Sequence, residues 1–121
     1  MFSLLMHTAI LSANTHGSPP PPLSRCTEKR FDQIVDHFSG ARATYWKQRY
    51  FICEPSWWRA PDGPIYFYSG NESPVEEYIN NTGLMWENAQ ADGALLVFAE
   101  HRFFGASWPF GTKEASVRHL E

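Results

Sequence analysis

The run Leu95–Ala99 constrains the fold of this chain most. Its sequence, LLVFA, is uniformly apolar, and it ends abruptly in the three ionisable residues Glu100, His101 and Arg102. A short apolar run of this kind favours a strand buried on both faces, as in a parallel sheet. Three ionisable side chains at the end of a buried strand cost free energy unless they are paired or used in chemistry.

A second apolar run, IYFYS at residues 65–69, also favours a strand buried on both faces. The segment between the two runs favours a helix over Pro74–Ala91, with Ser73 expected as the N-cap and a break near NNTG. Asp92-Gly93 ends the helix. The order strand, helix, strand predicts a βαβ unit with a right-handed crossover.

Upstream of this unit, Gln33–Phe38 and Lys47–Phe51 favour two antiparallel strands joined by the turn sequence SGARAT. In such a hairpin the numbers of paired residues sum to about 85, which places Cys53 opposite residue 32. Cys26 then lies roughly 20 Å farther along the strand. A disulfide between the two cysteines is compatible with the sequence but is not indicated by it. The fold class expected is α/β, a hairpin followed by a βαβ unit.

The N-terminal segment divides into two parts. Residues 1–16 are interpreted as either a secretory signal peptide or a disordered leader, because they are mostly apolar but have no basic residue at their start. Residues 17–28 are expected to be a Pro-rich linker, since Pro19–Pro22 favour an extended polyproline conformation. The folded part is expected over residues 29–121.

Charge and hydropathy exclude several classes of function. Ten Lys and Arg residues against thirteen Asp and Glu give a net charge of −3, and no basic stripe is present for a nucleic-acid partner. No apolar run approaches the ~18 residues of a membrane helix, so no membrane span is expected. No His or Cys stands at a metal-ligand spacing, and no metal or other cofactor is expected.

Six blocks of sequence follow one another from about Arg30 to Gly111: QIVDHF, KQRYF, GPIYFYSGNE, NNTGLMWENA, GALLVFAEHRFFG and PFG. In this order and spacing the chain resembles the proline-specific serine peptidases of the serine carboxypeptidase S28 type. The resemblance implies the N-terminal part of an α/β-hydrolase fold, with an incomplete sheet that leaves the edge of Leu95–Ala99 unpaired. It also implies a serine-type exopeptidase, a carboxypeptidase or a dipeptidyl peptidase, acting on peptides with proline.

The same resemblance implies a place in the secretory pathway, either extracellular or lysosomal/vacuolar, and is compatible with a homodimer of the complete enzyme. Three departures from the family's pattern remove hydroxyls and a carboxylate near the expected site. They are Ser73-Pro74 in place of Gly and an acid, Phe103-Phe104 in place of two tyrosines, and Ala106 in place of an acid. These changes concern specificity more than fold.

The largest departure is the absence of a G-x-S-x-G sequence, on which α/β hydrolases carry the nucleophilic serine before the acid and the histidine. No catalytic residue is therefore assigned in these 121 residues, which are expected to be inactive alone. Two alternatives stay open: an inactive truncated product, and a small secreted binding module that uses its aromatic residues.

The loop after the 65–69 strand is the expected oxyanion and substrate loop, and it comprises Gly70, Asn71 and Glu72. Acyl transfer needs preorganised N–H donors for the oxyanion, and the resemblance places one of them in this loop. Glycine allows the close backbone approach that such a donor requires.

At the end of the next strand, Glu100 and Arg102 lie two residues apart and would share one face of an extended chain. We therefore expect them to form an ion pair and, with His101, a structural clamp near the site. His101 is not the general base, because this fold places that histidine last in the chain.

Asn80-Asn81-Thr82 is an N-glycosylation sequon, and Asn80 is the expected acceptor if the chain enters the secretory pathway. Asn71-Glu72-Ser73 is formally a second sequon, but Pro74 directly after it makes it a poor acceptor.

Overall fold

The computed structural model describes residues 22–38 and 44–119. The segment 1–16, expected to be a signal peptide or leader, lies outside the described residues. The elements in chain order are η1 (Pro22–Arg25), β1 (Cys26–Ile34), β2 (Tyr45–Cys53), η2 (Pro55–Trp57), β3 (Ile65–Tyr68), α1 (Val75–Asn81), α2 (Gly83–Asp92), β4 (Leu95–Ala99) and α3 (Lys113–Val117).

The four strands form one mixed sheet in the order β1-β2-β4-β3. β1 and β2 are an antiparallel hairpin, β2 pairs antiparallel with β4, and β3 pairs parallel with β4. Because α1 and α2 connect the parallel strands β3 and β4, the expected hairpin and βαβ unit are both confirmed. The expectation that β4 has an unpaired edge is wrong, since β4 lies between β2 and β3.

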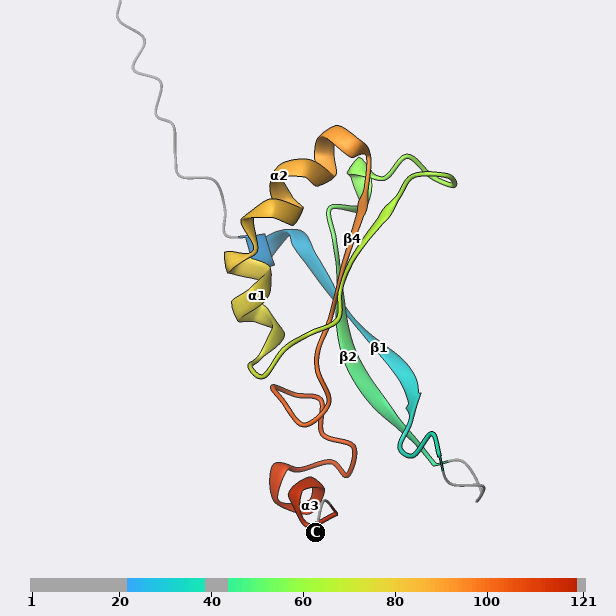
Figure 1. Cartoon of the computed structure of the whole chain (residues 1–121), viewed down its shortest axis with the longest axis vertical. Coiled ribbons are helices and arrows are strands. Elements are labelled where there is room, and N and C mark those ends of the chain that lie inside the picture. Colours follow the sequence, from blue (N-terminus) through green and yellow to red (C-terminus); the bar gives the residue numbers. More distant parts are fainter. Residues whose placement is uncertain (1–21, 39–43, 120–121) are drawn as a thin grey trace, which may run out of the picture.

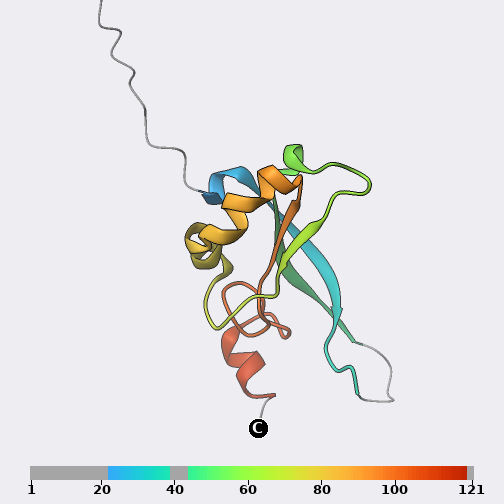
Figure 2. The same cartoon turned by 45° about the horizontal axis from the view of Figure 1, so that its top comes forward.

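One face of the sheet carries the core. Figures 1 and 2 show α1 and α2 together on one side of the sheet. Side chains from β2, β4 and both helices meet there, and the buried cluster comprises Phe51, Cys53, Val75, Ile79, Ala89, Ala94, Leu96 and Phe98. β3 is not buried on both faces as expected, because it is an edge strand whose Ile65 and Phe67 remain 57% and 61% exposed on the opposite face.

The hairpin register differs from the expected one. β1 begins at Cys26, within the segment expected to be a linker, and Cys26 pairs directly with Cys53 and forms a disulfide with it. The expected strand Gln33–Phe38 and its register are therefore wrong. The sequence of β1 is mostly charged and polar, since the strand lies at the edge of the sheet with most of its side chains exposed, so its apolar pattern is weak.

The helices break and end where the sequence predicts. Thr82 separates α1 from α2, and Gly93 ends α2 in the left-handed conformation with φ +66°. Pro74, and not Ser73, precedes the first helical residue; the Ser73 amide donates to the Asn71 carbonyl instead. Within residues 22–38 and 44–119, no helix is both long and apolar enough to cross a membrane.

Candidate functional site

Two loops lie side by side where the parallel strands β3 and β4 end (Figure 1). Gly70 has a φ of +85°, and a Cβ atom at this position would stand 2.5 Å from the His101 nitrogen and 2.7 Å from the Ala99 oxygen. The backbone after β3 therefore packs directly on the backbone after β4, at a distance that only glycine permits. This contact brings the predicted oxyanion loop beside Glu100–Arg102, the EHR segment.

Asn71 shapes the predicted oxyanion loop with two hydrogen bonds. Its side-chain Oδ1 accepts from the Glu72 amide at 2.9 Å, and its carbonyl accepts from the Ser73 amide at 2.8 Å. The side chains of Asn71 and Glu72 are exposed. The Glu72 amide is thus already engaged, which leaves the amides of Gly70 and Asn71 as the candidate donors of the loop.

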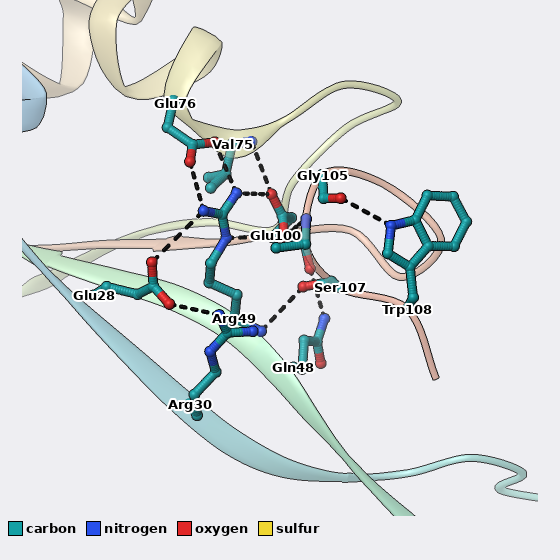
Figure 3. Close-up of polar contacts among 11 residues, drawn as sticks. Glu28, Arg30, Gln48, Arg49, Val75, Glu76, Glu100, Gly105, Ser107 and Trp108 are labelled. Carbon is teal, nitrogen blue, oxygen red and sulfur yellow. Dashed lines mark hydrogen bonds and ion pairs between the residues drawn. The ribbon is translucent and has the colours of Figure 1, made fainter. Parts of the chain in front are cut away.

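Glu100 is the most constrained ionisable residue in the described chain, with 0% of its surface exposed. Its Oε1 accepts from Arg49 Nη2 at 2.5 Å and from the Val75 amide at 3.2 Å. Its Oε2 accepts from Arg49 Nε at 3.1 Å (Figure 3). The same oxygen accepts from the Ala106 amide at 2.9 Å. One buried carboxylate therefore joins β2, the start of α1 and the loop after β4.

This environment keeps both groups charged. Burial would raise the pKa of Glu100, but hydrogen bonds from Arg49, Ser107 and the Val75 amide, together with the charge of Arg49, lower it below its usual value. Burial would likewise lower the pKa of Arg49, yet its hydrogen bonds and attraction to Glu100 and Glu76 raise it above the ordinary arginine value. The lowered pKa favours the ionised form of the Glu100 carboxyl beside the Arg49 guanidinium.

Arg49 has further partners around its guanidinium. Its Nη1 and Nη2 bind Glu76, in the first turn of α1, at 2.5 and 2.8 Å, and Glu28 lies 3.6 Å from Nη1. The Arg49 amide donates to the hydroxyl of the buried Ser107 at 3.0 Å. Figure 3 shows these groups converging on Arg49 from separate elements.

The expected ion pair between Glu100 and Arg102 is wrong. The strand ends at Ala99, a turn begins at Arg102 and Phe103 has a φ of 70°, so the chain does not stay extended through this segment. Arg102 instead donates to the carbonyls of Val35 and Ile34, at 2.9 and 3.0 Å, at the end of β1.

His101 is the exposed member of the EHR segment. Its Nδ1 is 2.8 Å from the Arg102 carbonyl, and its ring meets Phe104 edge-on at 5.5 Å between centroids. The structure brings all three residues to the end of β4, where Glu100 binds β2, Arg102 binds the end of β1, and the His101 ring contacts the backbone of its neighbour.

Sequence reasoning missed Arg49, Glu76 and Ser107. The sequence does contain an indication for Arg49. It stands two and four residues before the buried Phe51 and Cys53, and residues two apart on a strand share one face, so Arg49 faces the core side of β2. An arginine on a core-facing position requires a buried anion. Glu76 and Ser107 carry no comparable signal.

Asn80 lies away from this site, at the end of α1. Its side chain is exposed, and its Oδ1 accepts from the Leu23 amide at 3.1 Å. Among the residues that the structure describes, no group of three His, Cys, Asp or Glu side chains is placed to hold a metal ion.

Comparison with known proteins gives consistent matches. The profile of the family described as serine carboxypeptidase S28 matches residues 33–121. The bovine (Bos taurus) lysosomal Pro-X carboxypeptidase is 47% identical over 119 residues, which is 98% of this chain and 24% of the relative. The mouse (Mus musculus) lysosomal Pro-X carboxypeptidase is 45% identical over 95 residues, 78% of this chain and 19% of the relative.

The human thymus-specific serine protease is 34% identical over 90 residues, covering 74% of this chain and 17% of the relative. The chain thus spans about a fifth of the length of the curated relatives it matches.

Proposed function

This chain belongs to the serine carboxypeptidase S28 family, and on that premise we propose that it forms the N-terminal part of the catalytic domain of a serine-type exopeptidase. The domain is of the α/β-hydrolase type, and its substrates are peptides with proline. The observation that carries this proposal is the packing of the Gly70 turn on the end of β4.

Ligands of open α/β sheets gather beyond the carboxyl ends of parallel strands, and in hydrolases the loop after the third strand supplies an oxyanion donor. Here that loop is held against the next parallel strand at Gly70, with Asn71 bracing its turn. We assign the amides of Gly70 and Asn71 as the donors that stabilise the tetrahedral oxyanion. Glu72 follows them in the loop and its side chain is exposed.

The clamp that supports this site is assigned to Glu100 and Arg102, each acting on a different element. Glu100 binds Arg49 and the start of α1, and Arg102 binds the end of β1. His101 lies exposed between them. The EHR segment thus acts as a clamp near the site, and the ion pair in this clamp joins Glu100 to Arg49.

Turnover requires a serine activated by a histidine that a third group orients. No G-x-S-x-G occurs in the sequence, and the proposal places the nucleophile, acid and base outside these residues. The 121 residues alone are then inactive. β3 is an edge strand of the described sheet and its Ile65 and Phe67 side chains are exposed, which argues against the alternative of a self-contained binding module.

We place the protein in the secretory pathway, with the lysosome as destination. The Cys26–Cys53 disulfide is typical of chains that fold in an oxidising compartment. The names of the bovine and mouse relatives state a lysosomal place for those proteins.

A fluorophosphonate probe, which labels activated serines, tests this proposal. We expect no labelling of residues 1–121 and no release of the residue that follows proline in a Pro-X peptide. The same residues, extended through a G-x-S-x-G elbow, an acid and a histidine, are expected to do both at mildly acidic pH. Stoichiometric labelling of the 121-residue chain, or an extended chain that folds but hydrolyses no proline peptide, would refute the proposal.

A further inference from the structure

Glu100 holds both ends of the loop that leads from β3 to α1. At the first end, Gly70 packs on the backbone of Ala99, Glu100 and His101. At the second end, the Val75 amide donates to the Glu100 carboxylate at 3.2 Å. The loop has only six residues, 69–74, so anchoring it at Gly70 and at Val75 fixes its path closely.

The same carboxylate holds the neighbouring loop. The Ala106 amide donates to Oε2, and Gly105 packs so closely that a Cβ atom there would stand 1.9 Å from Oε1. A movement of the Glu100 side chain therefore shifts both loops together.

Arg49 makes this arrangement stable. An ionised carboxylate with no exposed surface needs an opposite charge and a full set of donors. Arg49 supplies two of the donors around Glu100 and the only positive charge among them. Through Nη1 and Nη2 it also binds Glu76, so that the first turn of α1 is tied to the same point.

We propose that Arg49 and Glu100 are positioning residues, which aim the amides of Gly70 and Asn71 at the reacting carbonyl of the substrate. This inference rests on the proposed function. The inference gives the hairpin a role in acyl transfer, since Arg49 comes from β2 and acts on the oxyanion loop through the Glu100 carboxylate. Correct aim matters, because a displacement of about 1 Å in such a donor costs roughly 10²-fold in rate.

Hydrogen exchange of the chain tests the coupling itself. In Glu100→Gln one oxygen becomes an amide nitrogen, which cannot accept from the surrounding donors. We expect exchange of segments 69–76 and 101–107 to become about tenfold faster, while the β1–β2 hairpin keeps its protection. Glu28→Gln is the matched control, because Glu28 also faces Arg49 but contacts neither loop; it should leave both segments unchanged.

Arg49→Lys is the second variant, since it keeps the charge but loses the fork that grips both carboxylates. It should open the same two segments. If both variants unfold globally, or if protection falls uniformly along the chain, the pair is merely structural and the inference is overturned.

Kinetics of a full-length enzyme containing these residues test the catalytic part. We expect Glu100→Gln to lower kcat roughly 10²-fold on a Pro-X peptide with KM nearly unchanged, and Glu28→Gln to leave both constants as they are. An active wild type with an unchanged kcat in Glu100→Gln would overturn the positioning role alone. An inactive wild type would overturn the proposed function, and the catalytic role of the pair with it.

Discussion

The Arg49 guanidinium grips the buried Glu100 carboxylate with two nitrogens, Nε at 3.1 Å and Nη2 at 2.5 Å, across 51 residues of sequence. This contact joins the antiparallel hairpin to the parallel pair at the end of the sheet where the candidate site lies.

Loss of Arg49 should destabilise the chain more than loss of Arg102. Arg49→Ala leaves a carboxylate buried and unpaired, and we expect it to lower the free energy of unfolding by about 3–5 kcal/mol. Arg102→Ala removes hydrogen bonds to two backbone carbonyls and should cost about 1–2 kcal/mol. Denaturant titrations of both variants measure the difference, and equal losses would contradict the assignment of Arg49 as the partner of Glu100.

Acid should weaken the fold through Glu100. Because the pKa of Glu100 is lower in the folded chain than in the unfolded one, its contribution to stability is present above the unfolded value of about 4.3. That contribution is lost as the pH falls through the folded pKa. We expect the free energy of unfolding to fall with pH below about 4.3 in the wild type and less steeply in Glu100→Gln. Identical slopes would show that another carboxylate dominates.

Gly105 and Gly111 offer a matched pair of substitutions. Both have positive φ, +53° and +84°, but a Cβ atom at Gly105 meets the Glu100 carboxylate, whereas at Gly111 nothing lies within 4 Å. Gly111→Ala should cost only the backbone strain, about 1 kcal/mol. Gly105→Ala should cost at least about 3 kcal/mol, since it also displaces Glu100. Thermal unfolding compares the two, and similar melting temperatures would exclude a rigid carboxylate.

Asn80 should carry a glycan when the chain is produced in a eukaryotic secretory host. Its side chain is exposed and only its Oδ1 is engaged, by the Leu23 amide. Gel mobility before and after glycosidase treatment measures occupancy. Asn80→Gln should abolish the shift and Asn71→Gln should not, because Pro74 follows the second sequon. A shift that persists in Asn80→Gln would show that another residue is the acceptor.

The open face of the sheet should bind a hydrophobic dye. Phe31, Ile65 and Phe67 are more than half exposed there, and with Val97 and Ala99 some of them line an open groove of about 490 Å³. Apolar surface beside a free strand edge favours association. Phe67→Lys should reduce dye fluorescence and raise solubility, while Tyr45→Lys, remote from the groove, should not. A soluble monomer with a sharp thermal transition and no dye binding would contradict this prediction.

Sequence patterns predicted the elements whose apolar residues are continuous or periodic. β4, the broken helix and the βαβ order could be predicted in this way, because the apolar residues of these elements show which of them are buried. The hairpin register could not be predicted from such patterns, because β1 is an exposed edge strand whose pairing is tied to the Cys26–Cys53 disulfide.

For the site, the position of the two loops followed from the strand ends, but the partner of Glu100 did not. Local geometry suggested Arg102, two residues away, on the assumption that the chain stays extended. The chain does not stay extended, because a turn begins at Arg102, and the partner of Glu100 lies on β2, which only the pairing of β2 with β4 brings near.

The place of β4 in the sheet also sets an order of events during synthesis. β4 lies between β2 and β3, which do not pair with each other in the described sheet. A chain leaving the ribosome can close the β1–β2 hairpin early, with its disulfide, whereas β3 has no strand to join until Leu95–Ala99 emerges. A nascent chain that pauses between Tyr68 and Leu95 therefore displays an unpartnered apolar strand, the kind of segment that chaperones retain.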